Sequence, residues 1–142
     1  MHKIVMLGDS GVGKTSMVGK LMNPEKAMNT NIPATMGIEF DTQVLNTANS
    51  GRVKAQLWDT AGQERFARVL LPTYFRKAKG VILVYDVTSS RSFESIGERW
   101  IKQMEEHTDV STLCILLVGN KSDLADGDRR EVNMSVASAF AA

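Results

Sequence analysis

The sequence predicts an α/β fold, in which a mostly parallel sheet carries one antiparallel hairpin at its edge and helices on both faces. Short apolar runs alternate along the chain with segments of helical periodicity. Two neighbouring runs instead alternate apolar and polar residues around a turn, which is typical of a half-exposed hairpin. The most distinctive motifs come directly after apolar runs, and parallel sheets bind ligands at the carboxyl ends of their strands.

The first half of the chain contains one strand, one helix and the hairpin. Residues 4–7 predict a buried strand that ends at a glycine-rich turn, and residues 16–22 follow with the pattern of a short helix. Residues 23–35 contain two prolines and several Asn and Thr residues, which predict a loop. Residues 38–45 and 53–58 alternate apolar and polar side chains and form the expected hairpin.

The second half adds two strands with a helix between them. Residues 80–86 and 113–119 are nearly continuous apolar runs, as expected for strands covered on both faces. The single cysteine, Cys114, lies inside the second run, which predicts a buried thiol. Residues 131–141 resemble the start of a further helix. Between residues 86 and 113 the pattern predicts a helix with one buried face and a serine N-cap. The side chains of the buried face are Phe93, Ile96, Trp100, Ile101 and Met104. The candidate caps are Ser89, Ser90 and Ser92.

Length and composition indicate one domain spanning residues 1–142. The chain has 15.6 kDa, 43% hydrophobic and 23% charged residues, and 17 basic against 16 acidic side chains. A net charge of +1 provides no global field for nucleic acid or an anionic bilayer, so we expect no nucleic-acid partner. The apolar runs are too short to span a membrane. We therefore expect a cytoplasmic protein.

Residues 8–15 match the pattern G-x-x-x-x-G-K-[ST] and follow a predicted strand. Glycines let backbone N–H groups curl around phosphate oxygens, and the next helix points its positive end at them. The Lys14 ammonium can reach terminal phosphates, and the Thr15 hydroxyl can bind Mg²⁺. The alternative interpretation of residues 8–15 is a glycine-rich turn that binds no ligand. The predicted strand before it and the predicted helix after it argue against this alternative.

Asp59 directly follows the second hairpin strand, within residues 58–66. A carboxylate at a strand end beside a phosphate loop can hold the shell of a magnesium ion. Gly62 permits a close approach of the backbone to a γ-phosphate, and Gln63 is placed to orient a water molecule. Taken alone, Asp59 fits a helix N-cap equally well.

Residues 120–123, with the sequence Asn-Lys-Ser-Asp, follow the last predicted strand. The two oxygens of Asp123 suit the N1 and N2 donors of guanine, and the Lys121 stem can cover the plane of the base. The alternative is an Asx-type turn. The motif at residues 120–123 follows an apolar strand in the same sheet as a phosphate loop, and this position favours guanine recognition over a simple turn.

Together these motifs resemble a small GTPase of the Ras superfamily, and the Rab branch fits best. The superfamily resemblance rests on residues 8–16, 35–40, 58–66, 85–88 and 120–123, and the Rab resemblance on residues 36–40, 64–66, 74–76 and 84–93. It implies a P-loop NTPase fold that binds GTP or GDP with Mg²⁺. Switch segments at about residues 28–38 and 59–74 would bind effector, exchange-factor and GAP proteins.

The resemblance also assigns roles to individual residues. Gln63 would orient the attacking water, and no arginine in cis is evident, so hydrolysis without a GAP would be slow. Magnesium would be held by Thr15, Thr35 and Asp59. The nucleotide would be bound by Ser10, Gly11, Val12, Gly13, Lys14, Thr15, Ser16, Thr35, Gly62, Asn120, Lys121 and Asp123.

The sequence departs from the family pattern at three places. Met28 stands where the family usually has an aromatic residue that packs on guanine. The final strand and helix of the family are not present before Ala142, so we expect an incomplete G domain with residues 113–118 as an exposed apolar edge. The prenylated tail is also missing, so membrane contact would be indirect, through partners at endomembranes.

Three hypotheses follow. The leading one is a Rab-like GTP/GDP switch that hydrolyses GTP slowly and acts in intracellular vesicle traffic through effectors. The second is a degenerate or truncated Rab-like interaction module with weak or no nucleotide cycling. Met28 and the missing segment favour it, and Gln63 and residues 120–123 oppose it. A P-loop kinase or ATPase is disfavoured by Asp123.

Overall fold

The computed structural model describes residues 1–25, 27, 38–60 and 64–142. These residues form a five-stranded sheet in the order β2-β3-β1-β4-β5, in which β2 and β3 are antiparallel and the other neighbours parallel. The strands are β1 (His2–Leu7), β2 (Ile38–Thr47), β3 (Gly51–Thr60), β4 (Ala78–Asp86) and β5 (Cys114–Asn120). The predicted fold class and the antiparallel hairpin at the sheet edge are confirmed.

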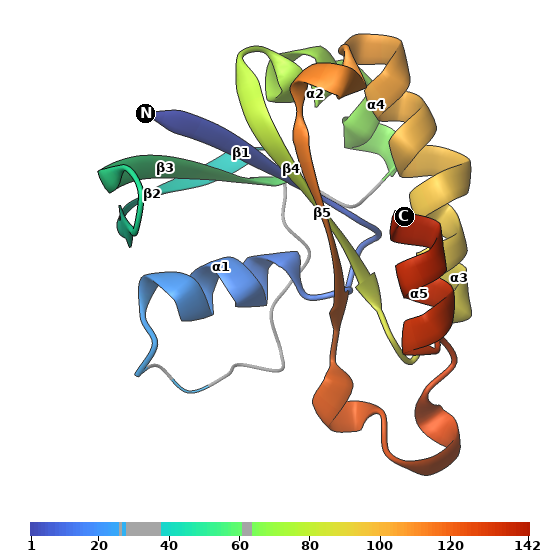
Figure 1. Ribbon diagram of the computed structural model, residues 1–142. Coiled ribbons are helices and arrows are strands. Elements are labelled where there is room, and N and C mark those ends of the chain that lie inside the picture. The colour runs from blue at the N-terminus through green and yellow to red at the C-terminus, as the bar shows by residue number, and fades with distance from the viewer. Residues whose placement is uncertain (26, 28–37, 61–63) are drawn as a thin grey trace.

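The helices lie on both faces of the sheet. Figure 1 shows α1 on one side, and α2, α3, α4 and α5 on the other. The helices are α1 (Lys14–Met22), α2 (Glu64–Phe75), α3 (Ser90–Ser95), the π-helical η1 (Ile96–Ile101), α4 (Lys102–His107) and α5 (Met134–Ala141). Three short 3₁₀ segments lie in the connections before and after β5: η2 (Val110–Thr112) precedes it, and η3 (Ser122–Leu124) and η4 (Gly127–Arg129) follow it. In the part of the chain that the structure describes, no helix combines the length and apolar character needed to cross a bilayer.

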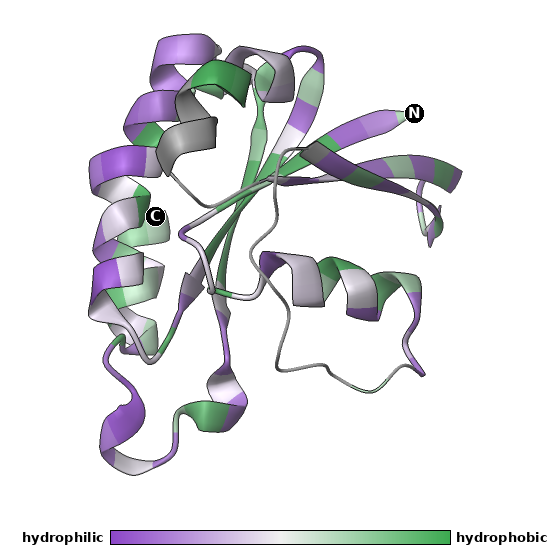
Figure 2. Cartoon of the chain, turned by 180° about the vertical axis from the view of Figure 1, so that it is seen from behind, coloured by the Kyte–Doolittle hydropathy of each residue, from purple (hydrophilic) through white to green (hydrophobic). Residues whose placement is uncertain are grey.

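The two faces of the central strands bury different hydrophobic clusters. Successive side chains of a strand point to opposite faces, so neighbours in β1 divide between the two clusters. Val5 and Leu7 pack in the larger cluster with Trp100, whereas Met6 packs with Val18 of α1. Figure 2 shows hydrophobic residues along these central strands and many hydrophilic residues on the outer side of the helix formed by α3, η1 and α4. The central strands are thus packed on both faces, and the loops at their ends start from this buried sheet.

The helix predicted between the last two strands runs without interruption through α3, η1 and α4. Ile96, Trp100 and Met104 are almost fully buried, as the spacing predicts. The Ser89 side chain caps α3 by accepting a hydrogen bond from the Ser92 backbone N–H at 3.2 Å, which confirms one of the predicted caps. The π-helical middle segment was not expected, because apolar spacing does not separate a π-helical turn from an α-helical one.

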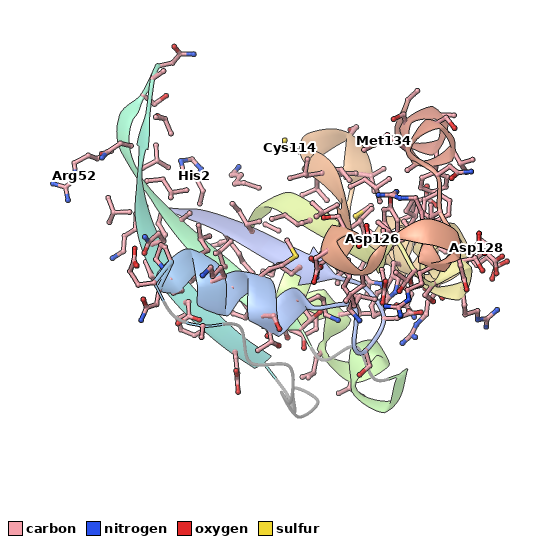
Figure 3. The ribbon with its side chains drawn as sticks, turned by 90° about the horizontal axis from the view of Figure 1, so that it is seen from below. His2, Arg52, Cys114, Asp126, Asp128 and Met134 are labelled. Carbon is pink, nitrogen blue, oxygen red and sulfur yellow. The ribbon has the colours of Figure 1, made fainter. Side chains whose placement is uncertain are left out.

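The outer strand β5 corrects one prediction. Cys114 is exposed, not buried, and Figure 3 labels it at the start of this strand. Ile115 and Leu116 are also exposed, which confirms the expected apolar edge. An apolar run reports the hydrophobicity of a strand, whereas burial depends on its neighbours, and within the described residues β5 pairs only with β4.

Candidate functional site

The parallel strands bring three of the motifs to the same edge of the sheet. Met6 of β1 pairs with Asp59 of β3, and Asp86 of β4 pairs with Asn120 of β5. The phosphate loop at residues 8–13 leaves β1 at this edge and leads into α1. Strand pairing therefore places side chains together that lie far apart in the sequence.

The phosphate loop turns tightly because its glycines adopt backbone angles that other residues rarely reach. Gly8 has φ 152° and Gly13 has φ 102°. A Cβ on Gly8 would lie 2.2 Å from the Val84 carbonyl oxygen, and one on Gly13 would lie 2.2 Å from Asn120 Nδ2. The loop thus packs against the ends of both β4 and β5 with no room for a side chain at either glycine.

Lys14 is held inside this loop. Its side chain is buried, and Nζ donates hydrogen bonds to the carbonyl oxygens of Gly8 at 2.7 Å and Asp9 at 2.9 Å. Burial lowers the pKa of Lys14 to about 8, against the opposing effect of the Asp59 and Asp9 carboxylates. Lys14 therefore remains mainly protonated at neutral pH. An ammonium has three donors, so these two bonds do not exhaust its capacity to bind an anion.

Thr15 and Asp59 meet beside Lys14. The Thr15 hydroxyl, in the first turn of α1, donates a hydrogen bond to Asp59 Oδ2 at the end of β3, and Asp59 is buried. Hydroxyl and carboxylate oxygens are suitable ligands for Mg²⁺, which usually keeps several waters and binds phosphates as well. Among the residues described, no three His, Cys, Asp or Glu side chains cluster as a metal site. The Thr15–Asp59 pair fits a magnesium ion shared with a phosphate ligand.

Asn120 joins the phosphate loop to the segment that follows β5. Its Nδ2 donates a hydrogen bond to the Val12 carbonyl oxygen at 2.9 Å. Lys121 has φ 63°, in the left-handed region, and its Nζ lies 2.8 Å from Asp86 Oδ2. Asp123 is exposed in η3. A base bound here would lie next to the phosphate loop.

Other predicted residues have fixed positions as well. Ser10 and Gly11 are exposed in the loop, Val12 is buried, and Ser16 is half-buried in the first turn of α1. Thr35, Gly62 and Gln63 lie outside the described residues. The predicted roles of all these residues toward a nucleotide and a metal remain predictions.

Three contacts of the site were not anticipated from the sequence. The Trp100 indole N–H donates a hydrogen bond to Asp9 Oδ1 at 2.9 Å, and the Arg99 guanidinium lies 3.9 Å from the same oxygen. The third contact is the Asp86–Lys121 ion pair. Burial raises the pKa of Asp86, but hydrogen bonds from Lys121 and Thr88 outweigh it, so the net shift is downward. Asp59 is selected from the sequence because it follows a predicted strand. Asp86 also lies at the end of a predicted strand, so the same criterion could have identified it as a site residue.

Comparison with known proteins gives consistent matches. The sequence model of the Ras family matches residues 3–142. The chain is 44% identical over 140 residues to Ras-related protein YPTC6 of Chlamydomonas reinhardtii, covering 99% of this chain and 61% of that protein. It is 47% identical over 125 residues to Ras-related protein Rab11E of Lotus japonicus, covering 87% and 54%. It is 44% identical over 142 residues to GTP-binding protein ypt3 of Schizosaccharomyces pombe, covering 100% and 63%. The chain thus spans 54% to 63% of the length of these relatives.

Proposed function

The chain belongs to the Ras family, and from this premise we propose that it is a Rab-like switch that binds GTP and GDP with Mg²⁺ and hydrolyses GTP slowly. One observation carries the proposal: a buried lysine, a hydroxyl and a carboxylate meet around a glycine-rich loop at the carboxyl edge of the sheet. The name of one relative, GTP-binding protein ypt3, supports the choice of nucleotide.

The phosphates would be bound by Lys14 and by backbone N–H groups of residues 10–16. Lys14 is already directed into the loop by its bonds to Gly8 and Asp9, so little ordering is needed when a phosphate arrives. Thr15 and Asp59 would hold Mg²⁺, and the ion supplies positive charge that neutralises phosphate oxygens. These residues would serve any nucleoside di- or triphosphate.

Guanine would be selected on the other side of the site. Asp123 can accept hydrogen bonds from N1–H and N2–H of guanine, whereas adenine presents an acceptor at its N1 position and no donor at C2. Lys121 would cover one face of the base with its aliphatic stem. Asn120 would keep this segment against the phosphate loop through its bond to Val12.

The hydrolytic and partner functions rest on the sequence resemblance. Gln63 would orient the attacking water, with Gly62 and Thr35 near the γ-phosphate and the metal. Effectors, exchange factors and a GAP would bind the switch segments at about residues 28–38 and 59–74. As in the Rab branch, the switch would act in vesicle traffic, as a cytoplasmic protein that partners recruit to endomembranes.

The test is to purify the protein with Mg²⁺, identify any bound nucleotide by chromatography, and measure single-turnover hydrolysis of GTP. We expect near-stoichiometric GDP or GTP, preference for GTP over ATP, and hydrolysis that is lost in Gln63→Leu. Guanine nucleotide without hydrolysis would favour the interaction module. A folded protein that binds neither GDP nor GTP contradicts the proposal, and preference for ATP would favour a kinase or ATPase.

A further inference from the structure

Asp86, at the end of β4, is a buried carboxylate with two separate sets of contacts. Its Oδ1 accepts hydrogen bonds from the Thr88 backbone N–H at 2.8 Å and from the Thr88 hydroxyl at 2.6 Å. Its Oδ2 lies 2.8 Å from Lys121 Nζ. One oxygen therefore stabilises the local turn, while the other forms an ion pair with the lysine that follows the end of the neighbouring strand.

The backbone around Asp86 is fixed by the pairing of β4 and β5. Asp86 is in register with Asn120, and the Val87 N–H donates a hydrogen bond to the Asn120 carbonyl oxygen at 3.0 Å. The Asp86 N–H donates to Ser92 Oγ at 3.0 Å. With both strand ends held, the carboxylate occupies a defined place beside Lys121, the residue that follows Asn120.

We propose that Asp86 is a positioning residue for guanine binding, which holds the Lys121 ammonium at the end of β4 so that the lysine stem is ready to cover the base. The inference rests on the proposed function and deepens it. A long lysine side chain has many rotamers, and a base that must order them loses affinity. The ion pair restricts these rotamers before the nucleotide binds.

The local turn by itself does not require this lysine. Asp109 makes the same kind of turn: its Oδ1 accepts hydrogen bonds from the Ser111 backbone N–H at 3.0 Å and from the Ser111 hydroxyl at 2.7 Å. Asp109 is exposed, and no lysine pairs with it among the described residues. The Lys121 contact of Asp86 is therefore additional to the turn, as expected for a role in the site.

The experiment is a double-mutant cycle on the rate of GDP release from the Mg²⁺-bound protein, with Asp86→Asn, Lys121→Met and both together. Asp86→Asn keeps acceptor capacity for Thr88 but removes the charge that attracts Lys121. We expect GDP release to become about tenfold faster in Asp86→Asn, in line with the loss of one charge-assisted hydrogen bond. In the Lys121→Met background the same substitution should change release by less than about twofold, because the ammonium is already absent.

Four controls separate positioning from a structural effect. Asp109→Asn alters the matching turn and should release GDP at the parent rate. The acceleration of release by EDTA should be the same factor in Asp86→Asn as in the parent, because the Mg²⁺ ligands are untouched. Melting curves of the nucleotide-free proteins should agree between Asp86→Asn and Asp109→Asn to within a few degrees. Asp86→Glu, which keeps the charge but shifts it by one methylene, should release GDP at an intermediate rate.

The outcomes distinguish this inference from the proposed function. A parent that binds GDP, with unchanged release in Asp86→Asn, overturns the inference alone. Equal acceleration in the presence and absence of the Lys121 ammonium also overturns it, because Asp86 would then act through its turn. A folded parent that binds no guanine nucleotide overturns the proposed function and this inference with it.

Discussion

The phosphate side and the base side of the site differ in how their lysines are held. Lys14 is only 5% exposed, and two backbone carbonyl oxygens of its own loop accept its hydrogen bonds. The Lys121 side chain is 30% exposed and is held by a carboxylate from another strand. Asp123, the residue expected to read guanine, is exposed. The lysine of the phosphate side is thus held within one strand–loop–helix unit, whereas the lysine of the base side depends on how β4 and β5 pair.

This difference has a functional consequence for each side. The backbone contacts of Lys14 form without a nucleotide, and they involve no group that reads a base, so the phosphate side should supply affinity for any nucleotide. The base side, held by fewer and more exposed contacts, should control which base binds and how fast it leaves. Substitutions on the two sides should therefore give different patterns of loss.

The largest effect should come from Lys14→Ala on the phosphate side. Removing the ammonium that meets the phosphates should cost about 3 kcal/mol, which is on the order of a 100-fold loss of affinity, for GDP and GTP alike. Titration with fluorescent GDP measures this loss of affinity. Lys102→Ala, at an exposed position in α4, is the control and should bind like the parent. A Lys14→Ala affinity within threefold of the parent would contradict the assigned role.

On the base side, Asp123→Ala should reduce selectivity more than it reduces phosphate binding. Loss of two hydrogen bonds to a charged acceptor should lower GDP affinity by about 2 kcal/mol and leave ADP affinity nearly unchanged. Competition of GDP and ADP against a fluorescent nucleotide gives the ratio. The control is Asp126→Ala, an exposed carboxylate that Figure 3 places in the segment after η3. An unchanged GDP-to-ADP ratio in Asp123→Ala would exclude it as the base reader.

At the junction of the two sides, Gly13→Ala and Gly11→Ala form a matched pair. Both glycines have positive φ, so both substitutions strain the backbone by about 1 kcal/mol. Only at Gly13 does the new Cβ meet another group, Asn120 Nδ2 at 2.2 Å, whereas Gly11 has open space. We expect Gly13→Ala to lower the free energy of unfolding by about 1 kcal/mol more than Gly11→Ala. Urea denaturation of both variants measures this difference. Equal losses of unfolding free energy in the two variants would show that the contact with Asn120 does not affect stability.

The smallest effect should come from Trp100→Phe, which keeps an aromatic ring in the core but removes the hydrogen bond to Asp9. Asp9 supplies one of the carbonyl oxygens that hold Lys14, so a looser loop should release GDP about three times faster, a change below 1 kcal/mol. Stopped-flow displacement of fluorescent GDP measures this rate. Asp9→Asn, which keeps an acceptor for the indole, should lie between the parent and Trp100→Phe. Release unchanged from the parent would show that the helix does not steady the loop.

The sequence alone determined the strands, the hairpin, the helix after β4 and the phosphate loop, because apolar periodicity and glycine spacing are properties of neighbouring residues. It also placed Thr15 and Asp59 at one edge of the sheet, since the carboxyl ends of parallel strands lie together. Thr35, Gly62 and Gln63 remain predictions outside the described residues.

Only the tertiary structure decided the exposure of Cys114, the Trp100–Asp9 hydrogen bond and the Asp86–Lys121 ion pair. The first depends on which strand lies at the edge of the sheet. The second joins residues 91 positions apart, from a loop and a π-helical segment that only tertiary packing brings together. The third depends on β4 and β5 pairing with Asp86 opposite Asn120. Each is set by which elements become neighbours in space, and the pattern of residues along one element does not contain that information.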